Sequence, residues 1–277
     1  MELYDQISYR LSKTITRKYS TSFSLGIHML DRSYHESIYA IYGFVRLADE
    51  IVDTFHVYDK EKLFRKFSED TFHAIEDRIS TNPVLNSFQD TVNKYKIDHD
   101  LIRAFLKSME MDLSIARYDD SNYSEYIYGS AEVVGLMCLR VFCGDDTKLY
   151  DELVPSARSL GSAFQKVNFL RDLKSDFKER GRVYFPGVDF SNFTGEQKKE
   201  IEAEIQKEFD FAWEGIKRLP KGSKLGVTVA YIYYKALFRK ISITPASRIQ
   251  NSRIRINNFT KFMLLIRTWF QHKLNLI

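Results

Sequence analysis

The chain has 277 residues and a mass of 32.6 kDa, which allows one large domain or two small ones. Its composition, 44% hydrophobic and 28% charged residues, excludes a disordered chain and a membrane-embedded bundle. Twelve glycines and five prolines are few for this length. Because β-rich proteins need many tight turns, this shortage favours a mostly helical fold.

The net charge of +4 is unevenly distributed along the chain. Residues 215–277 contain 13 Lys or Arg and no Asp or Glu, so this C-terminal quarter carries +13. The other 28 basic residues face all 37 acidic residues within 1–214, which gives that part −9. An acidic body with a basic segment argues against a uniformly basic nucleic-acid-binding protein. We therefore expect no nucleic-acid partner.

The cysteines and the apolar runs predict a soluble, cytoplasmic protein. Cys138 and Cys143 lie five residues apart, which is neither a metal-ligand spacing nor a disulfide framework. Residues 1–10 carry no apolar secretory segment. The longest apolar run near the end, residues 262–266, is far shorter than the roughly 20 residues of a spanning helix.

Helical periodicity, with capping and breaking residues, predicts helices along almost the whole chain. Asp31 or Ser33 is the expected N-cap of the second helix, and Pro186 lies in the one clear loop, residues 181–195. No strand pattern, repeat or linker stands out, so we predict one all-α domain over 1–277 that includes the basic segment 215–277. The predicted helices are 5–28 with a break near Ser20–Ser24, 34–57, 60–80, 84–95, 98–117, 122–142, 147–178, 196–217, 223–242 and 246–274.

A first carboxylate pair lies in the predicted helix 34–57. Asp49 and Asp53 are four residues apart, so their side chains project from one face, one turn apart. Like charges at this spacing are unfavourable without a cation. Tyr42 and Arg46 share the face, and the apolar residues around them indicate that the pair points into the protein.

A second polar stripe lies in the predicted helix 147–178. Asn168, Asp172 and Asp176 recur every four residues, and Gln165 nearly continues the stripe. Carboxylate and amide oxygens suit Mg²⁺, which leaves further positions to water and substrate phosphate. Each stripe alone is typical of a solvated helix face. Together, with an arginine beside each, they favour a site for two or three Mg²⁺ ions and a diphosphate.

No other motif indicates chemistry. The six histidines show no paired spacing, and the sequence has no Gly-rich phosphate loop, Gly-x-Ser-x-Gly or Cys/His cluster. The acidic pairs Asp119-Asp120 and Asp145-Asp146 are interpreted as turn and cap residues.

The motifs together resemble those of the phytoene synthase/squalene synthase family of head-to-head isoprenyl synthases, over nearly the whole chain. Ser20–Leu25 is similar to its Ser-x-Ser-Phe segment, and Tyr42–Asp53 to its first Asp-rich motif. Tyr126–Met137 resembles its Tyr-rich, Val-Gly-Leu-Met helix. Gln165–Asp176, followed by Arg180–Pro186, resembles the second Asp-rich motif with its loop, and this tandem is the most specific signal.

The resemblance implies an all-α isoprenoid synthase fold, a helical bundle with a central cavity that binds two prenyl diphosphates and Mg²⁺, with Mn²⁺ as the alternative ion. The first ionisation would release diphosphate from one allylic substrate, and the cation would alkylate the other to a cyclopropyl intermediate. A second ionisation would yield a linear hydrocarbon. Aromatic side chains would shield the cations from water, and the candidates are Phe23, Phe44, Phe164 and Phe169.

The resemblance also implies roles for individual residues. The metal ligands would be Asp49, Asp53, Asn168, Asp172 and Asp176, the four aspartates being catalytic. Tyr126 and Tyr128 would supply hydroxyls near the cation, and the sequence leaves open which of them faces inward. Tyr19 and Thr21 stand where some members carry His and Lys, which puts a phosphate contact there in doubt. The diphosphate would be bound by Arg46, Gln165, Asn168, Arg171, Tyr184, Arg253 and Arg255.

The basic C-terminal segment allows three interpretations. In the first, Arg253 or Arg255 folds back to neutralise diphosphate. In the second, residues 257–274 lie on the inner face of the cell membrane. Lipid would then meet Phe262, Leu265, Trp269 and Phe270, and anionic headgroups would meet Lys261, Arg267 and Lys273. In the third, this is an ordinary surface helix packed on the bundle.

The form of the first motif favours a prenyltransferase of the 15-cis-phytoene synthase type, which acts on geranylgeranyl diphosphate without NADPH in carotenoid biosynthesis. A downstream desaturase would be its partner. The alternative is a squalene or dehydrosqualene synthase using farnesyl diphosphate, of which the squalene type needs a reduced nicotinamide. A hypothesis of another class is a non-catalytic helical module that docks on membranes.

Overall fold

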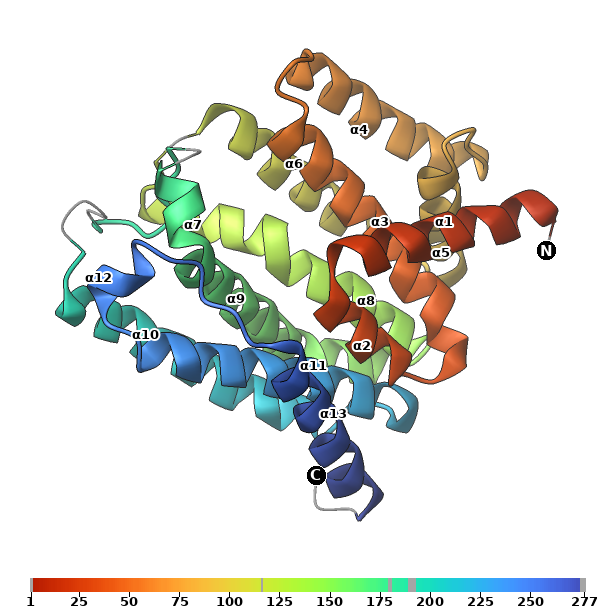
Figure 1. Cartoon of the computed structure of the whole chain (residues 1–277). Helices are drawn as coiled ribbons and strands as arrows, with labels where there is room; N and C mark the ends of the chain where they lie inside the picture. The colour runs from red at the N-terminus through yellow and green to blue at the C-terminus, as the bar shows by residue number, and fades with distance from the viewer. Residues whose placement is uncertain (1, 116, 179–180, 189–192, 275–277) are drawn as a thin grey trace.

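The computed structural model describes residues 2–115, 117–178, 181–188 and 193–274, and its helical architecture (Figure 1) confirms the predicted fold class. Within these ranges the only β pairing is an isolated bridge between Arg117 and Val183. The helices are α1 (Leu3–Tyr19), α2 (Thr21–His28), α3 (Arg32–Thr54), α4 (Lys60–Asp77), α5 (Pro83–Tyr95), α6 (His99–Ser114), α7 (Asp120–Ile127), the π-helix η1 (Tyr128–Glu132), α8 (Val133–Cys143), α9 (Thr147–Lys178), α10 (Gly195–Ile216), α11 (Lys221–Ser242), α12 (Ala246–Ile249) and α13 (Asn258–Lys273).

The predicted break near Ser20 and the predicted cap of the next helix are both confirmed. Ser20 has an extended backbone, and its hydroxyl accepts a hydrogen bond from the Phe23 amide at 3.3 Å, which starts α2. Asp31 caps α3 by accepting from the Ser33 amide at 3.0 Å, so Asp31 is the N-cap.

The prediction of one helix over 246–274 is wrong. The chain forms the single turn α12, then runs without helix through residues 250–257 before α13 begins. Ile254 and Ile256 are buried in this run, whereas Arg253 and Arg255 are exposed. This alternation has the period of an extended chain, and it is the local signal that opposes a helix. Figure 1 shows the run crossing the bundle between α12 and α13.

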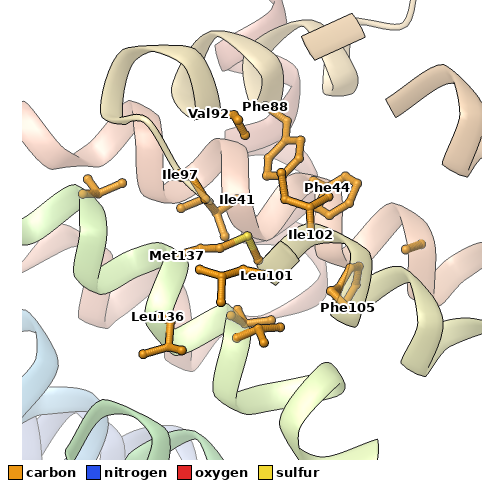
Figure 2. Packing of buried hydrophobic residues seen from close by; sticks show 14 of the residues in the cluster. Ile41, Phe44, Phe88, Val92, Ile97, Leu101, Ile102, Phe105, Leu136 and Met137 are labelled. Atoms are coloured by element: carbon orange, nitrogen blue, oxygen red, sulfur yellow. The ribbon is translucent and has the colours of Figure 1, made fainter. Parts of the chain in front are cut away.

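Two hydrophobic clusters form the core. The first joins α3, α4, α5, α6 and α8 (Figure 2), and in it the Phe44 ring stacks on Phe88 with centroids 3.9 Å apart. Phe44 is fully buried there and does not line the cavity described below, so its predicted place in a substrate pocket is wrong. The second cluster joins α9, α10 and α11 with residues of the 181–188 segment and of the 250–257 run.

Helices α7, η1 and α8 form one continuous stretch through the bundle. Among the described residues, Asp120–Cys143 is the one stretch long and apolar enough to cross a membrane by length and composition, and 56% of its apolar window is buried inside the protein. Burial of this kind is typical of a central core helix. In η1, Gly129 packs directly against α6, and a Cβ atom there would lie 2.4 Å from the Ala104 carbonyl oxygen.

We expect Gly129→Ala to destabilise the protein by about 1–3 kcal/mol, because the new methyl group meets backbone of α6 that can move only with its helix. Thermal unfolding followed by circular dichroism measures the effect. The matched control is Gly195→Ala at the start of α10, where a Cβ atom meets nothing within 4 Å. Equal melting temperatures for Gly129→Ala and the wild type would refute the close contact.

Candidate active site

A cavity of about 700 Å³ runs through the bundle beside α3 and α9. Along α9 its wall extends from Leu153 to Asp176, about 34 Å at the rise of an α-helix. Carboxylates gather where α3 and α9 approach their C-terminal ends, and the opposite end of the wall is apolar. The apolar end includes Leu30, Phe142, Leu153, Ile216 and Leu219. The cavity thus has a charged part and a long hydrophobic part.

The predicted face of α3 lines this cavity. Tyr42, Arg46, Asp49 and Asp53 all belong to its wall, because spacings of four, three and four residues keep them on one side of the helix. Arg46 forms an ion pair with Glu50 and lies 3.6 Å from an Asp49 oxygen. Its guanidinium stacks at 4.1 Å over the ring of Tyr19.

The predicted face of α9 lines the same cavity through Gln165, Asn168, Asp172 and Asp176. The Tyr234 hydroxyl donates to the Asn168 amide oxygen at 3.2 Å, and the Asn168 amide nitrogen lies 3.4 Å from the Gln165 oxygen. The structure therefore brings both sequence-predicted stripes to one space.

Asp172 has two arginine partners. Arg171 donates to it from the neighbouring position on α9, and its Nε lies 3.1 Å from each carboxylate oxygen. Arg253, from the 250–257 run, places its Nε 2.7 Å from Asp172 Oδ1 and lines the cavity. Arg255 is exposed and lies outside the cavity wall, and its backbone carbonyl accepts from Lys240. The structure thus brings Arg253, and not Arg255, to the predicted site.

The carboxyl group of Asp49 is incompletely compensated. Burial raises the pKa of Asp49 to about 7, Arg46 acts against this rise, and Asp53 and Asp112 add to it. The side chain keeps 34% exposure, and since it faces the cavity, water there offsets part of the burial. Beside it, Arg46 Nε is buried without a hydrogen-bond partner among the described residues. A cation at Asp49 and an anion at Arg46 would satisfy both groups.

The donor set fits a divalent metal shared with a ligand. In the part of the chain that the structure describes, no three His, Cys, Asp or Glu side chains group closely enough to hold a metal ion by themselves. Mg²⁺ characteristically takes one or two carboxylates and fills its remaining positions with water and phosphate oxygens. The oxygen donors of the α3 and α9 faces therefore fit Mg²⁺ bound together with a phosphorylated substrate.

Asp112 and Arg182 belong to this site although the sequence did not single them out. Both line the cavity. Arg182 Nη1 lies 3.1 Å from Asp53 and 3.6 Å from the Asp112 carboxylate, and its Nη2 donates to the Asp112 carbonyl at 3.0 Å. Asp112 has no other acid three or four residues away on α6, so a search for acids spaced by one helical turn misses it. Arg182 lies within Arg180–Pro186, the loop that resembles the one after the family's second Asp-rich motif. That resemblance was the one signal in the sequence that could have identified Arg182.

The structure distinguishes the two candidate tyrosines. Tyr126 lines the cavity, and its hydroxyl donates to Asp112 Oδ2 at 2.8 Å. Tyr128 lies outside the cavity wall, with the Arg158 guanidinium 5.0 Å from its ring. Tyr126 is therefore the inward-facing residue.

An aromatic wall encloses the space beside the carboxylates. The Tyr184 ring stacks on Phe169 with centroids 4.0 Å apart and lies 5.2 Å from Tyr126. Phe164 stacks on Tyr234 at 3.9 Å. All five rings line the cavity, as does Phe23, so three of the four predicted phenylalanines are in its wall. Such a wall excludes water and presents π-faces to positive charge.

Comparison with known proteins gives concordant findings. A family model described as squalene/phytoene synthase matches residues 16–260. The chain is 28% identical to a phytoene synthase of Arthrospira platensis, over 93% of this chain and 91% of that protein. It is 26% identical to a 4,4'-diapophytoene synthase of Staphylococcus haemolyticus, over 75% and 72% of the two chains. A crystal structure of a dehydrosqualene synthase superimposes with a TM-score of 0.83 at 19% identity, covering 97% of this chain and 98% of that one.

We predict that Asp112 makes the metal-free protein less stable as the pH rises. Burial raises the pKa of Asp112 from 3.8 to about 6, against the opposing effects of Arg182 and Tyr126. The native state therefore binds more protons than the unfolded state between these values, and the free energy of unfolding falls across this window. The expected loss is on the order of 3 kcal/mol.

Urea unfolding of the wild type and of Asp112→Asn, in EDTA at a series of pH values, measures this dependence. The free energy of unfolding of the wild type minus that of Asp112→Asn should fall from about pH 4 to about pH 6 and stay constant above that. A difference that does not change with pH, or one that rises, would contradict the prediction.

Proposed function

The chain belongs to the squalene/phytoene synthase family, whose members condense prenyl diphosphates head to head, and we propose that it converts two geranylgeranyl diphosphates to phytoene. The main support for this function is that two helix faces bearing aspartates, on α3 and α9, meet at the charged part of one long hydrophobic cavity. The C20 substrate is supported by the phytoene synthase relative, which aligns over nearly the whole chain. We also propose that residues 1–277 act as one domain, because helices of both halves line this cavity.

The family depends on a divalent metal, and we propose Mg²⁺. Asp49, Asp53, Asn168, Asp172 and Asp176 would hold it. When bound, the metal neutralises the diphosphate and makes it a better leaving group. Mn²⁺ would be the substitute ion.

The basic side chains of the site would bind the diphosphate. Arg46 offers an unpartnered Nε at the cavity wall, and Arg171 and Arg253 lie beside Asp172. Planar guanidinium groups donate several hydrogen bonds to phosphate oxygens and stay charged. Gln165, Asn168 and Tyr184 would add neutral donors. These groups would stabilise negative charge as it develops on the departing diphosphate.

The tyrosine and aromatic groups would protect the reacting carbon atoms. Burial raises the pKa of Tyr126 well above its usual range, and Asp112 adds to this rise. The hydroxyl therefore stays protonated and remains fixed by its bond to Asp112. The rings of Phe169 and Tyr184 beside it keep water from the carbocations of the cyclopropyl-forming and rearranging steps.

A C15 reaction is the second candidate function, and the diapophytoene synthase relative favours it. The cavity that we describe is the place where substrate length would be selected. In the C15 case, farnesyl diphosphate would replace geranylgeranyl diphosphate, and squalene formation would also require NADPH. A desaturase would use the product in either carotenoid route.

Purified protein with Mg²⁺ is expected to convert geranylgeranyl diphosphate to phytoene without NADPH, with release of diphosphate. EDTA should abolish turnover and Mg²⁺ should restore it. Asp49→Ala and Asp172→Ala should lower kcat by at least about 100-fold, because each removes charge that holds the metal and diphosphate. Mass spectrometry of the hydrocarbon and a diphosphate assay give the readouts.

The matched control is Asp145→Ala, an exposed turn aspartate, which should keep full turnover. Circular dichroism of each variant should show unchanged helicity. If farnesyl diphosphate gives a hydrocarbon, with or without NADPH, and geranylgeranyl diphosphate gives none, the C20 proposal is wrong and the C15 function takes its place. Absence of diphosphate release from both substrates would favour the non-catalytic membrane module.

Arg253→Gln is expected to lower kcat/KM by about 10- to 100-fold, since a charge-assisted hydrogen bond to the bound diphosphate is lost. Arg255→Gln is the matched control, two residues away, equally cationic, exposed and outside the cavity wall. Steady-state kinetics with saturating Mg²⁺ measure both variants. Equal losses in the two variants would indicate a general charge effect and refute a specific contact by Arg253.

A further inference from the structure

Helix α13 turns its apolar face away from the protein. Five large apolar side chains on this helix, and Leu274 directly after it, are 40–73% exposed; the five are Phe259, Phe262, Met263, Trp269 and Phe270. With Leu274 included, their spacings of three, one, six, one and four residues keep them within one stripe of an α-helix. In Figure 1, α13 (dark blue) projects from the bundle beyond α11.

The opposite face of α13 packs on the protein and is partly polar. Thr268 is fully buried there, and its hydroxyl donates to the Leu264 carbonyl at 2.8 Å. Lys261 donates to the Thr21 hydroxyl at 3.2 Å and lies 5.3 Å from the centre of the Tyr233 ring. A surface helix ordinarily buries its apolar stripe and exposes its polar face. An apolar stripe left exposed on a surface helix marks a site where another apolar phase or surface binds.

The orientation changes part of the predicted membrane face. Leu265 and Lys261 are both half-buried and lie on the side that faces the bundle, so neither belongs to the exposed stripe. Phe262, Trp269 and Phe270 are on the exposed side, as the membrane interpretation requires. Arg267 and Lys273 are exposed as well, so cations accompany the apolar side chains.

The charges beside the exposed apolar stripe of α13 indicate which kind of surface would cover it. Arg267 borders the stripe and Lys273 lies within it, whereas no Asp or Glu occurs anywhere after Glu214. A symmetric contact with a second copy of this chain would bring the same cations together with no acid to pair them. Anionic headgroups over an acyl phase would pair the cations and cover the aromatic rings. Trp269 is also the residue type that favours such an interface.

We propose that α13 is an interfacial anchor that docks this protein on a membrane containing anionic lipid. The exposed stripe would lie at the level of the headgroups and upper acyl chains, and Arg267 and Lys273 would contact lipid phosphates.

Two contacts of Lys261 connect the anchor helix α13 to the wall of the cavity. Lys261, in the first turn of α13, touches Thr21 and Tyr233, and Tyr233 lines the cavity. Arg253, five residues before α13, lines it too and keeps a side chain that is 49% exposed. Docking would hold this side of the cavity near the lipid. This consequence rests on the proposed function, because a water-insoluble hydrocarbon needs a route from the cavity to the bilayer.

The first test measures sedimentation with vesicles of phosphatidylcholine, with and without phosphatidylglycerol. The wild type should bind at least tenfold more tightly when phosphatidylglycerol is present. The combined variant Phe259→Ser, Phe262→Ser and Phe270→Ser should lose at least tenfold in binding to the anionic vesicles. Arg267→Gln with Lys273→Gln should lose roughly tenfold as well, and added salt should weaken wild-type binding.

The matched control is Leu3→Ser, Ile7→Ser and Leu11→Ser on α1. These three residues are 41–71% exposed and also form a helical stripe, but they lie far from α13 in sequence and carry no proposed anchor. This variant should bind like the wild type. A second readout uses Trp213→Phe, which leaves Trp269 as the sole tryptophan. Its emission should shift to the blue on addition of anionic vesicles.

Several outcomes would overturn the anchor. These are equal binding with and without phosphatidylglycerol, equal binding by the α13 serine variant and the wild type, and a wild-type dimer that this variant converts to monomer in light scattering. Vesicle binding needs no substrate, so it is read independently of turnover. Diphosphate release in detergent should be equal in the wild type and the α13 serine variant, and its absence from both would refute the proposed function alone.

Discussion

The site depends on how the protein compensates carboxylates inside a helical bundle. A buried charge is strongly unfavourable unless a partner and hydrogen bonds replace its hydration. The acids lie on helices, and two of their cationic partners come from non-helical segments. Arg182 follows α9 and reaches both Asp53 and Asp112, and Arg253 follows α12 and reaches Asp172. These two segments therefore join α3, α6 and α9 around one charged space.

The rest of the cavity follows from close approach of helices with small residues. A Cβ atom at Gly161 would lie 2.8 Å from the Ala131 carbonyl oxygen, and one at Gly215 would lie 2.3 Å from Ser156 Cβ. All four residues line the cavity. Small side chains at these crossings let η1, α9 and α10 pack closely beside the cavity. The charged space thus continues into a hydrophobic channel suited to a long hydrocarbon chain.

The sequence was informative wherever the signal was local. Asp49 with Asp53, and Asn168 with Asp172 and Asp176, share a face because helical spacing alone decides it. Asp112 and Arg182 gain their meaning only when α6 and the segment after α9 meet, which no spacing reveals. Tyr126 and Tyr128 are two residues apart, and which of them faces the cavity depends on how their helical stretch packs in the bundle. In the same way, the periodicity of α13 predicted an apolar face but not the direction in which it points.

The cations of the basic C-terminal quarter have different surroundings, which the uniform charge of the segment did not reveal. Arg253 is directed inward and pairs with an aspartate of the cavity. Lys261 fixes the start of α13 against α2 and α11, and Arg267 and Lys273 face outward beside the exposed aromatic side chains. A segment without acids avoids neutralising its own cations. That property would serve the proposed diphosphate binding and the proposed membrane docking equally, since both partners carry anionic phosphates. One compositional bias can therefore support two surfaces within the same segment.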